Sequence, residues 1–331
     1  MWRRGISVSF IVLAMAFAAC FNNAERDNPL DPKSDQYQNS GRIDGHVYTY
    51  YAPFKPLPAA RLTASPLELS VWSDPGGAFS FANMTPGAYS IKVDATGYAM
   101  DSATVNVEPG RTVSLTFFLD GLPRLDSLRL VTGYVHESFP IEPSQLIDCQ
   151  AKVGDPDGYA DIDSVSMIIP DFNMNAVLPA TTRIGYYQKR LLPSDLPVVD
   201  VEAMLGHPIF IKISDRVGQI RWAGPFFLVR VIQQEPIIES PRGSSLVNSK
   251  PLFKWKALQL PFPFTFRLEV YRIIDPILFE LSLNVSNLPS ATLEYQAIQA
   301  LRPGSYLWTI SVVDEFGNWS SSIRATFQVG G

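Results

Sequence analysis

Apolar and polar residues alternate in short runs along most of this chain, and turns rich in proline and glycine separate the runs. A period of two predicts strands that bury one face, because successive side chains of a strand point to opposite faces of a sheet. Strands that recur about every 8–12 residues between such turns are typical of β-sandwiches. The pattern therefore predicts an all-β fold of tandem β-sandwich domains.

The alternating runs fall into three blocks, and we expect one β-sandwich in each of residues 41–121, 122–235 and 236–331. Strands of the first block are expected at 43–50, 61–64, 67–72, 79–81, 89–93, 103–107 and 113–119. Those of the second are expected at 127–131, 146–153, 164–169, 186–191, 209–214 and 226–232, with a turn at 215–218 and a short helical turn at 199–205. Those of the third are expected at 251–255, 266–271, 308–312 and 325–329.

The N-terminal segment has a different pattern. Two arginines precede an apolar run at 6–19, and small residues then lead to Cys20. This is the layout of a secretory signal peptide, and the run is shorter than the roughly 20 residues of a membrane-spanning helix. Residues 1–19 are therefore expected to be a signal peptide. Residues 20–40 are polar and without periodicity, and we expect them to form a flexible tether.

The sequence Phe17-Ala18-Ala19-Cys20 resembles a bacterial lipobox, although Phe17 stands where leucine is commonest. The resemblance implies that Cys20 carries acyl chains after cleavage and anchors the protein to a membrane. No aspartate follows Cys20, which by the rule of enteric bacteria implies the outer membrane or cell surface, with the leaflet left open. Ordinary signal-peptide cleavage and an uncleaved anchor are the alternatives.

Charge narrows the range of partners. The chain has 27 basic and 32 acidic residues, a net charge of −5, and the mature chain without residues 1–19 has a net charge of −7. We see no basic stripe, and nucleic-acid binding depends on neutralising phosphates with lysine and arginine. Nucleic acid is therefore not an expected partner. The expected partners are the membrane, through the lipid anchor, and polysaccharide or envelope proteins.

The first block carries an ordered set of motifs: Gly77-Ala78-Phe79-Ser80-Phe81, Pro86-Gly87-Ala88-Tyr89, Gly97-Tyr98 and the apolar strand at 115–119. In this order they resemble the carboxypeptidase regulatory-like domain, which is a transthyretin-like sandwich. The resemblance implies a non-catalytic module that serves as a spacer, a folding aid or an interaction surface.

The other two blocks resemble common sandwich modules. Residues 122–235 are similar to bacterial immunoglobulin-like domains, without a specific motif. Residues 236–331 resemble fibronectin type III, on the segments around Trp255 and Tyr306. In that family the tyrosine before strand F folds its hydroxyl back onto the chain, so the resemblance implies a tyrosine corner at Tyr306.

The sharpest candidate for chemistry is an acidic loop in the second block. Asp155, Asp157, Asp161 and Asp163 lie close together around a glycine. Calcium takes six to eight oxygen ligands, and aspartates in a turn supply several, so these four residues are a candidate calcium site. Their spacing does not match the EF-hand. The alternative is a hairpin loop in which aspartates cap turns.

No other motif predicts a reaction. The chain has two cysteines, so lipidation of Cys20 would leave Cys149 as the one free thiol. Cys149 lies in an alternating run, which predicts a small buried hydrophobe. We expect no enzyme. The function expected is that of a non-catalytic cell-envelope lipoprotein acting as a scaffold, adhesion or protein-interaction module. The alternatives are a carbohydrate-binding accessory protein for polysaccharide capture, and a hydrolase that uses the acidic loop.

Overall fold

The computed structural model describes residues 31, 33–34, 39–136, 143–198, 200–243 and 245–330. The expected signal peptide and Cys20 lie outside these residues. The chain divides into two compact units, Met1–Leu122 and Pro123–Gly331.

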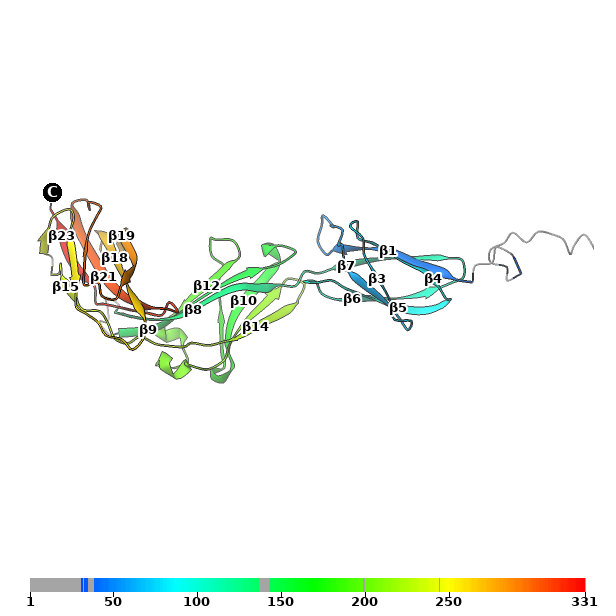
Figure 1. The fold of residues 1–331 in the computed structure, drawn as a ribbon, viewed down its shortest axis with the longest axis horizontal. Coiled ribbons are helices and arrows are strands. Elements are labelled where there is room, and N and C mark those ends of the chain that lie inside the picture. Colours follow the sequence, from blue (N-terminus) through cyan, green and yellow to red (C-terminus); the bar gives the residue numbers. More distant parts are fainter. Residues whose placement is uncertain are drawn as a thin grey trace, which may run out of the picture. The chain divides into compact units, whose positions relative to one another are not determined.

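The first unit is a sandwich of two sheets, with strand orders β4-β1-β7 and β3-β2-β5-β6 (Figure 1, blue to cyan). Every strand expected in this unit is confirmed, with bounds that differ by at most three residues. The strands are β1 (Gly41–Thr49), β2 (Arg61–Ser65), β3 (Leu69–Trp72), β4 (Ala78–Met84), β5 (Gly87–Asp94), β6 (Asp101–Val107) and β7 (Thr112–Leu119).

Two motifs of the first unit show why their residue types are required. Gly77 has a φ of 76°, and a Cβ added there would lie 2.5 Å from the carbonyl oxygen of Val47. Glycine is therefore the residue that permits this turn to approach β1. The hydroxyl of Tyr89 donates to the carbonyl oxygen of Thr85 at 2.9 Å, which ties β5 to the turn that precedes it.

The second unit holds two sandwiches. One four-stranded sheet has the order β11-β10-β13-β14, and a three-stranded sheet has the order β15-β17-β20. These strands are β10 (Ile162–Ile169), β11 (Met174–Val177), β13 (Ile209–Asp215), β14 (Ile220–Phe226), β15 (Ile238–Ser240), β17 (Leu252–Trp255) and β20 (Glu294–Gln296).

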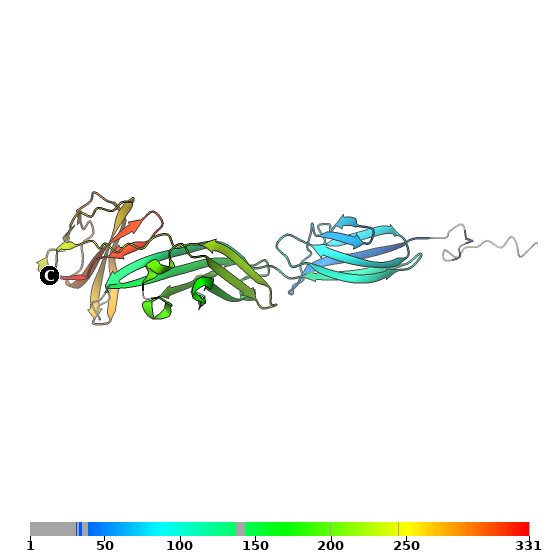
Figure 2. The same ribbon diagram turned by 90° about the horizontal axis from the view of Figure 1, so that it is seen from below.

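A nine-stranded sheet runs through both sandwiches of the second unit, with β12-β9-β8-β22-β21-β18-β19 as its main path. Figure 2 shows its long green strands reaching the orange and red strands of the C-terminal sandwich. The strands of this sheet are β8 (Arg124–His136), β9 (Pro143–Gly154), β12 (Tyr186–Leu191), β16 (Ser245–Val247), β18 (Phe264–Asp275), β19 (Leu278–Pro289), β21 (Gly304–Asp314), β22 (Trp319–Ser321) and β23 (Ala325–Val329).

The two sandwiches are joined where β22 pairs in parallel with β8, Trp319 opposite Gly133 and Ser320 opposite Tyr134. The blocks that the sequence separates at residue 235 thus share one sheet. Gly133 is required at this point: a Cβ there would lie 2.8 Å from the Cε2 of Trp319 and 2.8 Å from the Cδ1 of Leu146.

A buried hydrogen-bond network reinforces the joint. The side-chain oxygen of Asn318 accepts the backbone N–H of Thr132 at 2.9 Å, and its amide donates to Asp314 at 3.0 Å. Arg230 donates to the same Asp314 carboxylate at 2.7 Å, while the Thr132 hydroxyl donates to the Arg230 carbonyl at 2.7 Å. Buried polar groups are costly unless they are paired, so this network makes the joint specific.

Each sandwich of the second unit has its own core. One contains Cys149, which is fully buried and belongs to the same cluster as Ile147, Val165 and Ile211. Burial raises the pKa of its thiol to about 12, so the expectation of a small buried hydrophobe is confirmed. The other core is built around aromatic rings, with Phe253, Trp255, Phe266, Trp308 and Phe327 all buried.

Two local expectations for the second unit are confirmed. The Tyr306 hydroxyl donates to the carbonyl oxygen of Arg302 at 2.7 Å, which is the expected tyrosine corner. A single 3₁₀ turn occupies Val201–Met204, inside the expected helical turn.

One expected strand is wrong. A strand was expected at 226–232, but residues 227–232 pair with no other strand. The strand that follows β13 is β14 (Ile220–Phe226), which lies earlier in the chain. The turn after β13 is tight because Asp215 accepts the N–H groups of Gly218 and Gln219, so the chain re-enters the sheet at Ile220. The apolar residues Leu228 and Ile232 are buried without joining a sheet. The strands β11, β16, β19, β20 and β22 were not expected. Across the described residues, no helix has the length and apolar character to span a bilayer.

We predict that Gly133→Ala lowers the free energy of unfolding of the second unit by about 1–3 kcal/mol, because the new methyl group overpacks against Trp319 and Leu146. Urea denaturation followed by tryptophan fluorescence measures the change. Gly330→Ala is the matched control, since its Cβ would find only an ordinary contact at 3.6 Å. Equal midpoints for the two variants would contradict the close approach of Trp319 to Gly133.

Candidate metal centre

The acidic loop connects β9 to β10 and is shaped by hydrogen bonds within it. The Asp155 carboxylate accepts the N–H of Asp157 at 2.7 Å, and the Gly158 N–H donates to the Asp155 carbonyl at 3.1 Å. Gly158 has a φ of 107°, which favours glycine. A one-turn 3₁₀ helix, Tyr159–Asp161, then leads into β10. Capping of turns by aspartate therefore accounts for part of the acidic pattern.

Strand pairing brings a further aspartate to this loop. β10 and β13 are antiparallel, and Ile162 at the start of β10 lies opposite Asp215 at the end of β13. The N–H of Arg216 donates to the carbonyl oxygen of Asp161 at 2.9 Å, which fixes the two chain segments to each other. Asp215 and Asp161 are therefore neighbours in space.

Three carboxylates converge as a result. Asp155, Asp161 and Asp215 each offer one oxygen, and these oxygens lie within 4.8 Å of one another. Asp161 is 4% exposed and Asp215 is 3% exposed, whereas Asp155 is half-buried. One oxygen of Asp215 accepts two backbone N–H groups, but its Oδ2 is buried without a hydrogen-bond partner, as is the Oδ2 of Asp155.

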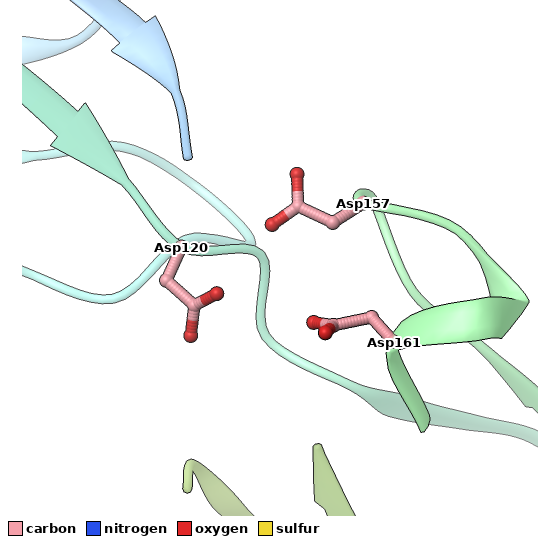
Figure 3. Close-up of side chains that lie close together, drawn as sticks. All are labelled: Asp120, Asp157 and Asp161. Carbon is pink, nitrogen blue, oxygen red and sulfur yellow. The ribbon is translucent and has the colours of Figure 1, made fainter. Parts of the chain in front are cut away.

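Of the four residues in the expected set, the structure places Asp155 and Asp161 in this group. Asp157 also has a carboxylate oxygen within 4.8 Å of one from Asp161, and Figure 3 shows both side chains projecting from the loop and the short helix. Asp163 lies instead on the exposed face of β10, outside these groups. Sequence reasoning placed Asp215 in a turn and did not associate it with the loop, because only the β10–β13 register makes them neighbours.

The electrostatics of the group are unfavourable without a cation. Burial, together with the negative charges of Asp161, Asp157 and Asp215, raises the pKa of Asp155 from its ordinary value of 3.8 to about 6. The hydrogen bond from the Asp157 N–H opposes this effect in part. Like charges that share a desolvated site disfavour ionisation of one another.

The arrangement can hold a hard divalent cation. Calcium binds carboxylate oxygens at about 2.3–2.6 Å, so two ligands of one ion lie at most about 5 Å apart. The 4.8 Å limit on the three carboxylate oxygens fits that span. Asp155, Asp161 and Asp215 are thus the residues suited to ligate Ca²⁺, and backbone carbonyls or water would complete its coordination.

The carboxypeptidase regulatory-like domain family matches residues 42–120. No curated protein matches the chain in sequence.

Among solved structures, the chain is similar to the Bacillus anthracis TIE protein at 11% identity and a TM-score of 0.28, over 88% of this chain and 49% of that one. It thus spans about half the length of that protein. It is also similar to BcpA, the major pilin subunit of Bacillus cereus, at 9% identity and a TM-score of 0.30, over 88% of this chain and 95% of that one. Chicken CNTN1 FN1–FN3 domains give 9% identity and a TM-score of 0.30, over 82% and 91% of the two chains.

In a buffer with chelator, we predict that raising the pH from about 4 to about 6.5 lowers the stability contribution of Asp155 by about 1–2 kcal/mol, with its partial exposure taken into account. The folded pKa of about 6 lies above the ordinary value of 3.8, so the folded state binds this proton more tightly within that window. Loss of the proton therefore favours unfolding. Urea denaturation across the window, in the chain and in Asp155→Asn, isolates the effect; equal slopes with pH would contradict it.

Proposed function

We propose, from the premise that residues 42–120 are a carboxypeptidase regulatory-like domain, that this chain is a lipid-anchored, non-catalytic scaffold of the cell envelope whose second unit binds Ca²⁺. The lipobox-like segment ending at Cys20 supports the anchor and the outer-membrane or cell-surface location. The domain type supports a module that spaces or presents a binding surface.

One observation carries the calcium assignment: the Oδ2 atoms of Asp155 and Asp215 are buried, lack a hydrogen-bond partner and belong to a group of three converging carboxylates. An unpaired buried charge is expensive, and native proteins pair such charges or use them to coordinate metals. No described lysine or arginine forms an ion pair with Asp155 or Asp215. A divalent cation would supply the missing partner and hold the β9–β10 loop to the end of β13.

The burial of the group favours a structural ion over hydrolysis. Asp161 and Asp215 are almost inaccessible to solvent, and their nearest oxygens are within 4.8 Å. Glycosidase carboxylates flank the scissile bond and must leave room for substrate between them, at separations of about 5–5.5 Å or 6.5–9.5 Å. A sugar cannot enter between these two side chains, which argues against the hydrolase alternative at this loop.

We expect Ca²⁺ at about 1 mM to raise the melting temperature of the second unit. If the concentration is about 100-fold above the dissociation constant, the stabilisation is about 2.7 kcal/mol, or roughly 5–10 °C for a unit of this size. Differential scanning calorimetry of the full chain in detergent, with Ca²⁺ and with chelator, measures it. Asp215→Asn should remove the calcium response, because the amide keeps an acceptor for the Gly218 and Gln219 N–H groups but carries no charge.

Asp163→Asn is the matched control for this experiment, since it removes one aspartate from the same segment but outside the group. This variant should keep the full calcium response. A response that is absent from the unaltered chain, or that survives in Asp215→Asn, would overturn the assignment of the site.

The anchor is tested separately. Cells that express the chain and grow with a clickable fatty acid should label it, and Cys20→Ser should abolish the label because the acylated sulfur is lost. Cys149→Ala is the control and should keep the label, since Cys149 is fully buried in a core. Label on Cys20→Ser, or none on the unaltered chain, would rule out lipidation at this cysteine.

A further inference from the structure

A cleft of about 590 Å³ lies in the second unit, on the sheet that its two sandwiches share. One wall comes from β8, β9 and β12, and the other from β18, β19, β21 and β22. Along β18 the core residues Phe266, Leu268 and Val270 alternate with side chains that line this cleft. The volume is in the range of a site for a small molecule or for a short piece of a polymer.

Arginines outnumber carboxylates four to two in the lining of the cleft. Arg129, Arg190, Arg267 and Arg324 line it, whereas its carboxylates are limited to Asp148 and Glu269. The whole chain has a net charge of −5, so this is a local concentration of positive charge on an acidic protein. A cleft lined by one sign of charge attracts ligands of the opposite sign.

Two of these guanidinium groups have N–H donors to offer. Asp148 accepts two hydrogen bonds from Arg190, each at 2.8 Å, so that pair is internally satisfied. The Nε of Arg267 is buried 3.4 Å from a Glu269 oxygen without a hydrogen bond, but the side chain is 26% exposed, so the rest of its guanidinium is what a ligand can reach. Arg129 is exposed and forms no ion pair with a described residue. Arginine presents its donors in a planar fork that matches a carboxylate.

The indole ring of Trp319 supports two of the guanidinium groups. The guanidinium of Arg267 lies 5.4 Å from the ring centroid, and that of Arg190 lies 5.9 Å from it. Trp319 is itself fixed against Gly133 at the joint between the sandwiches. The guanidinium groups of Arg190 and Arg267 are thus preorganised, which lowers the cost of binding.

Neutral side chains of the cleft distinguish among anionic ligands. Tyr271 and Phe279 line it, and Phe279 is 39% exposed, so an aromatic ring is available to contact the flat apolar face of a sugar. Gln188 and Thr309 also line the cleft and suit hydroxyl groups. An acidic peptide would use the arginines but has few hydroxyls for these polar groups.

We propose that this cleft binds a carboxylate-bearing sugar, such as a uronic-acid unit of an acidic polysaccharide. Arg129 and Arg267 receive the carboxylate, and Tyr271 and Phe279 contact the sugar ring. This site is separate from the aspartate group and goes beyond the scaffold role, so it stands whether or not Ca²⁺ binds.

Isothermal titration of the full chain in detergent tests the proposal, with tetragalacturonate as the ligand and the neutral tetrasaccharide of galactose and tetraglutamate as comparisons. Of the three compounds, we expect only tetragalacturonate to bind, and we expect salt to weaken its binding. Arg129→Gln and Arg267→Gln should each weaken it about tenfold to a hundredfold, the effect of losing hydrogen bonds to a charged group. Arg221→Gln, which removes the same charge from the exposed face of β14, should bind as the unaltered chain does.

Arg129→Gln alters an exposed side chain, so its fold is not at risk, and calorimetric unfolding of each variant checks this directly. Four results would each overturn the proposal. Three concern the ligands: no binding of tetragalacturonate tighter than about 10 mM, equal affinity for the neutral sugar, or tighter binding of tetraglutamate. The fourth is an unchanged affinity for tetragalacturonate in both cleft variants when they remain folded.

Discussion

The parallel pairing of β22 with β8 is the contact on which the second unit depends. The ladder has only two residue pairs. The joint therefore also depends on the hydrogen bond that the Asn318 side chain accepts and on the close packing that Gly133 permits. The side-chain oxygen of Asn318 accepts the backbone N–H of Thr132, so this buried donor is paired. Gly133 has no Cβ, which leaves room for the ring of Trp319. Sandwich modules joined only by a linker move relative to one another by default. A shared sheet makes the pair one body.

The arginine-lined cleft is a consequence of this joint. Its walls come from strands on both sides of it, and Trp319 takes part in the pairing with Gly133 while it also supports the guanidinium groups of Arg190 and Arg267. The geometry of the proposed sugar site is therefore only as rigid as the joint. A change that loosened β22 would move the arginines of one sandwich away from those of the other.

The aspartate group has an excess of negative charge, whereas the cleft has an excess of positive charge. At the cleft, Asp148 pairs with Arg190 and Glu269 lies beside Arg267, so four arginines face two carboxylates and Arg129 is left without an ion pair among the described residues. At the β9–β10 loop, burial and mutual repulsion raise the pKa of Asp155, and a cation is the partner that would favour the ionised form. Both sites occur where strands end or sheets meet, because that is where side chains from distant segments converge.

The sequence by itself determined the all-β class and the strands of the first unit to within a few residues, because alternation and Pro/Gly turns are local signals. It also determined the Tyr306 corner and the buried Cys149. Tertiary structure alone decided that Asp215 joins Asp155 and Asp161 while Asp163 faces solvent, and that Trp319 lies on Gly133. These contacts follow from strand register and from pairing between distant segments, and no local pattern of residues encodes which strands will meet.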